Sequence, residues 1–335
     1  MSALVTGTAS WRAEVDGAVV ALAASRDGRI AVVGAEGSLT LLSADGAVEH
    51  TAAVSRGGLA VAWSPHADRI AVGSVDGVDV LDGTGAVIGG HRGGWCSAMA
   101  WSVDGTRLAA GVGRTLIVLN PDGTQRWTAR RDSTVTGVAW IKSRVATAAY
   151  GGVFLHDRSP AVAPDVMAFT GSLLRLSISP NRRWAASGNQ DATLHVWGVG
   201  RRGDELSMAG YPSKISALEF SPDSSLLASG GGPDVTVWDF TGAGPRGSTP
   251  RILQGHQQVV TAVAWSPDGD LLAGSGADGR VAVWRPRRAV PGSPAAAVDL
   301  LARDSSATAA GWDGGGRLLA GWADSTVVAH VVVGA

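Results

Sequence analysis

The stretch VVTAVAWSPDGDLLAGSGADGRVAVW, from Val259 to Trp284, carries the pattern that decides the fold. Its first apolar run ends at Trp265 and is followed by the polar turn SPDG. A second apolar run, a glycine-rich turn and a third apolar run complete the stretch. Short apolar runs separated by such turns predict three antiparallel strands, which we name a, b and c in chain order.

Seven further stretches of the chain repeat this pattern. The residues that open the first turn of the eight units are Ser25, Ser64, Ser102, Ile141, Ser179, Ser221, Ser266 and Asp313. Helical periodicity is not sustained anywhere, so we predict an all-β protein. The units leave no long stretch for another domain, and we expect residues 1–335 to form a single domain.

Strand a of each unit is almost wholly apolar and rich in alanine, as at Ala262 and Ala264. A run that is apolar on both faces predicts a strand that is covered on both faces. Small side chains suit places where sheets crowd together. A ring of radially packed sheets satisfies both requirements.

At this point the sequence resembles the WD40-repeat β-propellers. The matching pieces are SPDG at Ser266 to Gly269, the pair Gly255-His256, the turn Ala277-Asp278-Gly279 and the pair Trp238-Asp239. The resemblance implies blades of four strands, in which an outer strand d follows strand c. Eight units predict a single closed propeller of eight blades, with seven blades, the more usual number in this family, as the alternative.

The last unit ends at Ala335 without room for its own strand d. The segment from Leu4 to Val15 precedes the first unit, and it alternates Trp11 and Ala13 with charged residues. This alternation is typical of an outer strand. We therefore predict that the N-terminal strand completes the last blade and leaves no unpaired inner edge.

Blades of this family often contain a hydrogen-bonded tetrad of His, Ser or Thr, Asp and Trp, and no unit of this chain has all four. The seventh unit has His256, Asp278 and Trp284, but Gly274 stands where the hydroxyl belongs. We therefore expect stability to rest mainly on apolar packing. His156 and His330 occupy the strand-c position of the tryptophan, and we interpret them as structural replacements.

No catalytic or metal-binding motif is visible. Cys96 is the one cysteine, and no two of the seven histidines have the spacing of a local metal motif. Nucleophile-elbow, phosphate-loop and zinc-protease motifs are absent from the sequence. We predict no enzymatic activity, no cofactor and no metal, although a catalytic set scattered over several blades would leave no motif.

The composition restricts the classes of partner. A net charge of −1 excludes the strong overall field that drives nonspecific binding to nucleic acids or membranes. The longest apolar run, Ala18 to Ala24, is far shorter than the roughly 20 residues of a membrane-spanning helix. With one cysteine and no recognisable export signal, we expect a cytoplasmic protein. We also expect it to be monomeric. The preference for arginine over lysine suggests a GC-rich bacterial genome.

The candidate binding surface is the face formed by the loops that join strand d to the next strand a. Trp95 lies in one such loop, HRGGWC, and Tyr211 has no packing role that repeats between units. Aromatic residues and arginines often anchor interfaces. The predicted binding residues are Trp95, His91, Arg92, Arg130, Arg131, Tyr211 and Lys214.

Two functions remain open on the sequence. The first is a non-enzymatic scaffold that presents its loops to another protein, which is what the resemblance implies. The second is an enzyme or small-molecule-binding propeller whose site lies at the channel mouth, lined by Trp95, His91 and Tyr211.

Overall fold

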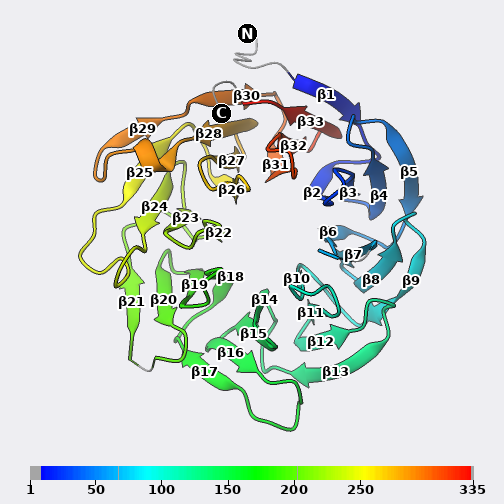
Figure 1. The fold of residues 1–335 in the computed structure, drawn as a ribbon, viewed down its shortest axis with the longest axis horizontal. Helices are drawn as coiled ribbons and strands as arrows, with labels where there is room; N and C mark the ends of the chain where they lie inside the picture. The colour runs from blue at the N-terminus through cyan, green and yellow to red at the C-terminus, as the bar shows by residue number, and fades with distance from the viewer. Residues whose placement is uncertain (1–8, 67, 202, 333–335) are drawn as a thin grey trace. The chain divides into compact units, whose positions relative to one another are not determined.

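Short antiparallel strands make up nearly all of the computed structural model, which describes residues 9–66, 68–201 and 203–332 (Figure 1). Each predicted group of three strands is present and is joined by a fourth strand. Within the described residues, the one helical element is a 3₁₀ turn, η1 (Pro286–Arg288). The chain divides into two compact units, an N-terminal unit of Glu14–Leu176 and a C-terminal unit of Ser177–Ala335 with Met1–Ala13.

The N-terminal unit contains blades one to four, each an antiparallel sheet in the order a, b, c, d. Blade one consists of β2 (Val19–Ala24), β3 (Ile30–Gly34), β4 (Ser38–Leu42) and β5 (Val48–Ala53). Blade two consists of β6 (Gly58–Trp63), β7 (Arg69–Ser74), β8 (Gly77–Asp82) and β9 (Val87–Arg92). Blade three consists of β10 (Ala98–Trp101), β11 (Leu108–Val112), β12 (Thr115–Leu119) and β13 (Gln125–Arg130). Blade four consists of β14 (Gly137–Ile141), β15 (Arg144–Ala149), β16 (Gly152–His156) and β17 (Asp165–Ala168).

Blades five to seven follow along the chain, and strand β18 of blade five contains the boundary between the two units. Blade five consists of β18 (Leu173–Ile178), β19 (Trp184–Asn189), β20 (Leu194–Gly198) and β21 (Glu205–Met208). Blade six consists of β22 (Ala217–Phe220), β23 (Leu226–Gly230), β24 (Val235–Asp239) and β25 (Arg251–Gln254). Blade seven consists of β26 (Val260–Trp265), β27 (Leu272–Gly276), β28 (Arg280–Trp284) and β30 (Asp299–Ala302).

Blade eight is completed by the N-terminal strand, as predicted. Strand β1 (Ala9–Glu14) pairs with β33 (Thr326–His330), which continues through β32 (Leu318–Trp322) to β31 (Ala307–Trp312). Along β1, Trp11 is half-buried and Ala13 is buried, whereas their neighbours are exposed. Residues 4–8 of the predicted strand lie outside the described residues. The fold is thus an all-β propeller of eight blades, and the seven-blade alternative was wrong.

Blade six has a fifth strand that the sequence did not predict. Strand β29 (Pro294–Ala296) belongs to the connection between strands c and d of blade seven, yet it pairs in parallel with β25 of blade six. Proline at its first residue suits an edge strand, because a proline there removes no hydrogen bond from the interior of the sheet. The long connection therefore joins two neighbouring blades of the C-terminal unit.

The burial of strand a differs from the prediction. In β2, only Val19 is fully buried and the other five residues are half-buried, whereas every residue of β3 and β4 is buried. Strand a is the edge strand of its sheet, so no strand of the same sheet lies beyond it. The core is therefore centred on strands b and c rather than on strand a.

A repeated hydrogen bond explains the tryptophans at the end of strand a. In the N-terminal unit, the indole N–H of Trp140 donates to the Ala100 carbonyl of the preceding blade at 2.8 Å. The same bond recurs from Trp63 to Ala23, from Trp101 to Ala62 and, in the C-terminal unit, from Trp265 to Glu219 and from Trp312 to Ala264. These five indoles join successive blades, so they serve packing rather than ligand binding.

Candidate protein-binding surface

The loop that carries Trp95 joins β9 to β10 in the N-terminal unit. Gly93 and Gly94 precede the tryptophan with φ values of +136° and +141°, a region that side chains disfavour. Before the tryptophan, the Gly93 N–H donates to the Asp76 carbonyl at 3.0 Å. After it, the Trp95 carbonyl accepts the Gly113 N–H and the Cys96 N–H donates to the Ser74 carbonyl, both at 2.8 Å. Because the backbone is held on both sides, the indole of Trp95, 65% exposed, projects from a fixed position.

The same hydrogen-bond path leads to a second exposed aromatic residue. The Val135 N–H donates to the Gly113 carbonyl at 2.9 Å. In the same loop, the Ser133 hydroxyl accepts the N–H of Tyr150 at 2.8 Å. Tyr150, in the turn between β15 and β16, is 59% exposed. Hydrogen bonds therefore connect the loops of Trp95 and Tyr150 across blades two to four.

Tyr150 was missed by the sequence analysis, although a signal was available. It lies in the turn between strands b and c, and these turns lie at the same end of a blade as the loops that join strand d to the next strand a. The sequence predicts Trp95 as a binding residue because its position has no packing role that repeats between units. A search of the b-to-c turns for aromatic residues would identify Tyr150 as a further candidate binding residue.

Two arginines are neighbours in sequence of the residues on this hydrogen-bond path. Arg130 ends β13 and pairs in register with Thr115, which follows Arg114 along the chain. Both guanidinium groups belong to exposed residues, and neither forms an ion pair with any described residue. We define the Trp95–Tyr150 surface as Trp95, Arg114, Arg130 and Tyr150. The surface thus offers two exposed aromatic rings and two unpaired positive charges to a partner.

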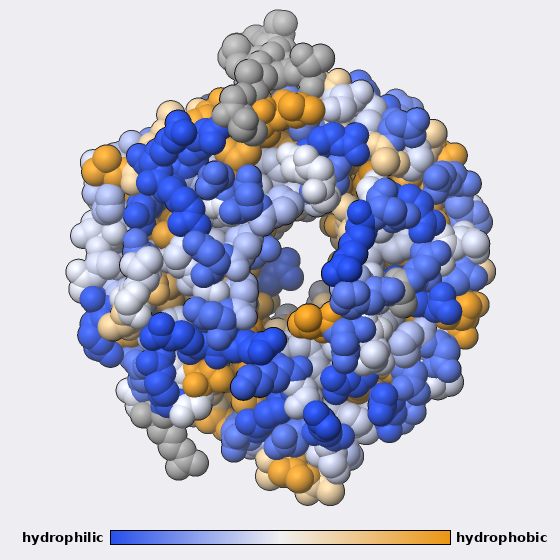
Figure 2. Space-filling view, viewed as in Figure 1, coloured by the Kyte–Doolittle hydropathy of each residue, from blue (hydrophilic) through white to orange (hydrophobic). Residues whose placement is uncertain are grey.

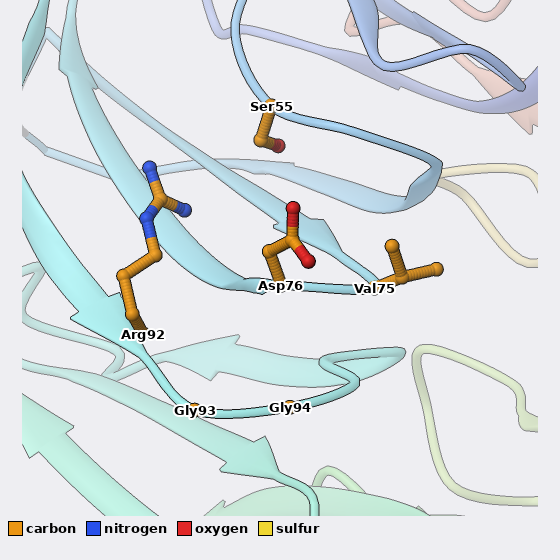
Figure 3. Close-up of a pocket in the computed structure, with 6 residues that line it drawn as sticks. All are labelled: Ser55, Val75, Asp76, Arg92, Gly93 and Gly94. Atoms are coloured by element: carbon orange, nitrogen blue, oxygen red, sulfur yellow. The ribbon is translucent and has the colours of Figure 1, made fainter.

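Arg92 has a structural partner that the sequence did not reveal. Its guanidinium binds the carboxylate of Asp79 through two bonds of 2.9 and 2.6 Å, and the Asp79 side chain is only 2% exposed. Arg92 also lines an open pocket of about 520 Å³, in which its side chain and that of Asp76 point toward the loop of Ser55 (Figure 3). Asp76 in turn pairs with Arg56 at 3.3 Å. The pocket charges are thus neutralised internally.

Arg131 and His91 also serve the fold. The guanidinium of Arg131 lies over the ring of Phe154, 4.1 Å from its centroid, and the Arg131 N–H donates to the Arg114 carbonyl at 2.7 Å. His91 lies on strand β9, opposite Val78 of β8, and is half-buried. Arg131 therefore holds the loop in place, and His91 belongs to a strand rather than to the loop.

Tyr211 is a correction to the predicted surface. Its hydroxyl lies 2.7 Å from the Ser229 hydroxyl and accepts the indole N–H of Trp238 at 2.9 Å. Burial of the phenol is the largest influence on its pKa, which is raised. In blade six the tyrosine thus joins a strand-b hydroxyl to a strand-c tryptophan, and it is not a free surface anchor. Lys214, three residues further on, is exposed.

The other predicted polar groups in the blades are structural. His156 lies 3.1 Å from the Thr147 hydroxyl, and burial lowers its pKa to about 4. His330 lies 2.7 Å from the Asp299 carboxylate, and both side chains are buried. His256 lies 3.1 Å from Asp278, but the indole of Trp284 donates to a backbone carbonyl instead. The histidines at the tryptophan position are therefore structural replacements, as predicted.

The described residues do not assemble a metal site. Among them, no group of three or more His, Cys, Asp or Glu side chains could hold a metal ion. Burial raises the pKa of the Cys96 thiol to about 12, so this cysteine stays protonated at neutral pH. Tyr211 forms a hydrogen bond within blade six, so it is not available to the small-molecule site predicted from Trp95, His91 and Tyr211. No helix in the described part of the chain is long and apolar enough to cross a membrane.

Hydrophilic side chains dominate the face of the molecule shown in Figure 2, and hydrophobic side chains are scattered among them. Single exposed hydrophobic residues are common on protein surfaces. The candidate surface is distinguished instead by two large aromatic rings on loops that hydrogen bonds hold together.

Comparison with known proteins agrees with this geometry. The family model "WD domain, G-beta repeat" matches residues 84–120, 166–198, 205–239 and 247–285. Each match runs from an outer strand through strands a, b and c of the next blade, as from β9 to β12. The chain therefore carries WD40 repeats, and the resemblance predicted from the sequence is confirmed.

A similar solved structure is the crystal structure of the computationally designed Ika8 protein. It is 21% identical to this chain, has a TM-score of 0.75, and the match covers 96% of this chain and 99% of that one. At this level of identity, the likeness concerns the fold alone.

Proposed function

We propose that the protein is a non-enzymatic interaction module that binds another protein through the Trp95–Tyr150 surface. WD40 repeats, which commonly serve protein interactions, support the class of function. The observation that carries the proposal is the exposed Trp95 on a backbone fixed by hydrogen bonds on both sides. A rigid aromatic side chain buries a large area on binding and loses little conformational entropy.

The charges of the surface indicate the kind of partner. Arg114 and Arg130 have no acidic partner among the described residues, whereas Asp132 is exposed in the adjacent loop. A partner segment that combines apolar side chains with carboxylates would match both features of the surface. We also propose that the protein acts in the cytoplasm, where the buried Cys96 would stay reduced.

Affinity capture with matched variants tests this proposal. Wild-type protein, a Trp95→Ala/Tyr150→Ala double variant and a Val103→Ala control would each be immobilised and exposed to extract of the source organism. Val103 is 70% exposed and lies in the a-to-b turn at the opposite end of blade three. The bound proteins would be quantified by mass spectrometry.

We expect at least one protein to be captured by the wild type and by Val103→Ala, and to fall about tenfold or more with the double variant, as for the loss of two anchor residues. Melting temperatures of the three proteins should agree, because neither aromatic side chain is part of the core. Capture that is unchanged in the double variant, or lost only in Val103→Ala, would show that the surface is wrongly assigned.

A further inference from the structure

Three arginines line one open pocket in the N-terminal unit, at the end of the blades opposite to Trp95. The pocket has a volume of about 570 Å³ and is lined by Thr106, Arg107, Arg126, Trp127, Arg158, Ser159 and Pro160. Arg107 comes from the a-to-b turn of blade three, Arg126 from the start of β13, and Arg158 from the c-to-d loop of blade four. Three separate segments of the chain therefore place arginine side chains around one pocket.

None of the three arginines forms an ion pair within the described part of the chain. Arg107 stacks over the ring of Trp140, 4.6 Å from its centroid, which leaves the edge of the guanidinium free to donate hydrogen bonds. Arg126 donates one bond of 3.2 Å to the neutral amide oxygen of Asn120. Arg126 and Arg158 therefore remain without a carboxylate that would compensate their charges, whereas Arg107 interacts electrostatically with Asp104.

The acids nearest in sequence are occupied elsewhere. Asp157, beside Arg158, pairs with Arg144 at 3.4 Å, and Asp165 pairs with the same arginine at 2.7 Å. Asp104 accepts hydrogen bonds from the hydroxyls of Ser102 and Thr106. Asp157 and Asp165 therefore do not neutralise the pocket, and the charged Asp104 offsets only Arg107, so the pocket keeps a net positive charge.

We propose that this arginine pocket binds a phosphoryl group carried on a peptide segment of a partner protein. A single carboxylate is satisfied by one bidentate guanidinium, whereas a phosphoryl dianion offers three acceptor oxygens and about two charges to several arginines. Trp127, half-buried at the pocket wall, and Pro160 supply apolar contact for residues that flank the phosphoryl group. This site is separate from the Trp95–Tyr150 surface and does not depend on that proposal.

Isothermal titration with four probes tests the site. The probes are a short capped peptide containing phosphoserine, the same peptide with serine, the same peptide with aspartate, and inorganic phosphate. The proteins are the wild type, Arg126→Gln/Arg158→Gln, the single variant Arg158→Gln, and an Arg56→Gln control. The control removes one positive charge, as Arg158→Gln does, from the other end of the same unit.

We expect the phosphoserine peptide to bind at least about tenfold more tightly than the serine peptide, the aspartate peptide or inorganic phosphate, as for several charge-assisted bonds. The Arg126→Gln/Arg158→Gln variant should lose about tenfold or more in affinity, Arg158→Gln should lose part of it, and the control should stay within about twofold. The exposed Arg158 has no structural partner, so its single variant remains informative if the double variant unfolds.

Equal affinity for the aspartate and phosphoserine peptides would overturn the assignment to a phosphoryl group. Inorganic phosphate that binds as tightly as the phosphopeptide would overturn the assignment to a peptide. Binding that is unchanged in both pocket variants would show that the arginine pocket is not the site.

Discussion

At the scale of single residues, the indole at the end of strand a forms a hydrogen bond that recurs between five pairs of neighbouring blades. Trp140→Phe keeps most of the ring but removes the N–H that donates to the Ala100 carbonyl. The variant should lower the free energy of unfolding by about 1 kcal/mol, the usual value for one hydrogen bond. Urea denaturation measures this difference.

Trp95→Phe is the matched control for this experiment, because the Trp95 ring is exposed and no hydrogen bond from its indole is present. We expect this control to match the wild type within about 0.5 kcal/mol. A Trp140→Phe variant as stable as Trp95→Phe would show that the repeated indole bond contributes nothing.

Tyr211 provides a second prediction at this scale. Tyr211→Phe leaves the indole N–H of Trp238 and the Ser229 hydroxyl without their shared partner. An unsatisfied buried polar group costs about 1–3 kcal/mol, so the melting temperature should fall measurably. Tyr150→Phe, which changes an exposed tyrosine, should not alter it. Equal melting temperatures for the two variants would contradict the role assigned to Tyr211.

The first turn of four blades, in which a serine hydroxyl donates to an aspartate, predicts a response to acid. In blade three, the Ser102 hydroxyl donates to Asp104 at 2.5 Å and is the largest influence that lowers the pKa of Asp104 from 3.8 to about 2. A carboxyl whose pKa is lower in the folded state adds stability above its unfolded pKa, and this stability is lost as the pH falls through the folded pKa. Stability should therefore decline between about pH 4 and pH 2.

Ser102→Ala should raise the pKa of Asp104 toward 3.8 and reduce this acid-dependent part of the stability. NMR titration of the Asp104 carboxyl carbon measures the pKa, and urea denaturation at several pH values measures the stability. A pKa that stays near 2 in Ser102→Ala would show that the hydroxyl is not the cause.

At the scale of elements, strand β1 is the segment whose removal should be most damaging. Deleting residues 1–15 removes the strand that pairs with β33, together with the bond of 3.5 Å from the Arg12 guanidinium to the Thr326 hydroxyl. It also exposes the surface against which Ala13 is buried. We expect a loss of at least about 2 kcal/mol, since an edge of backbone groups and apolar surface become exposed together. Thermal and urea denaturation measure the loss.

Deleting residues 1–8 alone is the control, because it keeps the whole of β1. That shorter deletion should cost less stability than the deletion of residues 1–15. If the two deletions melt at the same temperature, strand β1 does not stabilise blade eight.

The sequence predicted elements well where a local pattern repeats. Apolar runs and polar turns located the strands, and the shared register of His156 and His330 identified them as structural. It could not predict Tyr211, because the hydroxyl of that residue reaches partners 18 and 27 positions further along the chain. Nor could it predict β29, whose partner belongs to a different blade.

Part of the candidate site also could not be predicted from the sequence. The exposure of Trp95 follows from its place in a loop outside the repeat. The engagement of Arg92 by Asp79 depends on the register between β8 and β9, and that of Arg131 by Phe154 depends on the path of a loop. Charged loop residues look alike in a sequence, and only their partners separate structural arginines from available ones such as Arg114.

At the scale of the whole molecule, eight blades present two kinds of surface. In the N-terminal unit, one end of the blades carries the Trp95–Tyr150 surface, and the other end carries the arginine pocket. Stability comes from strands b and c of each blade, so loops at either end can change without rebuilding the core. This separation is what a scaffold requires, since binding residues and packing residues are different.

Hydrogen-exchange mass spectrometry on the free protein and on its complex with a captured partner shows whether the partner binds the Trp95–Tyr150 surface. We expect slower exchange on binding in residues 93–97, 113–114, 131–136 and 149–152, which form this surface and the loops that hold it. Exchange in the a-to-b turns of blades one to three should not change. Protection confined to those turns or to the arginine pocket, with the Trp95 loop unaffected, would show that the partner binds elsewhere.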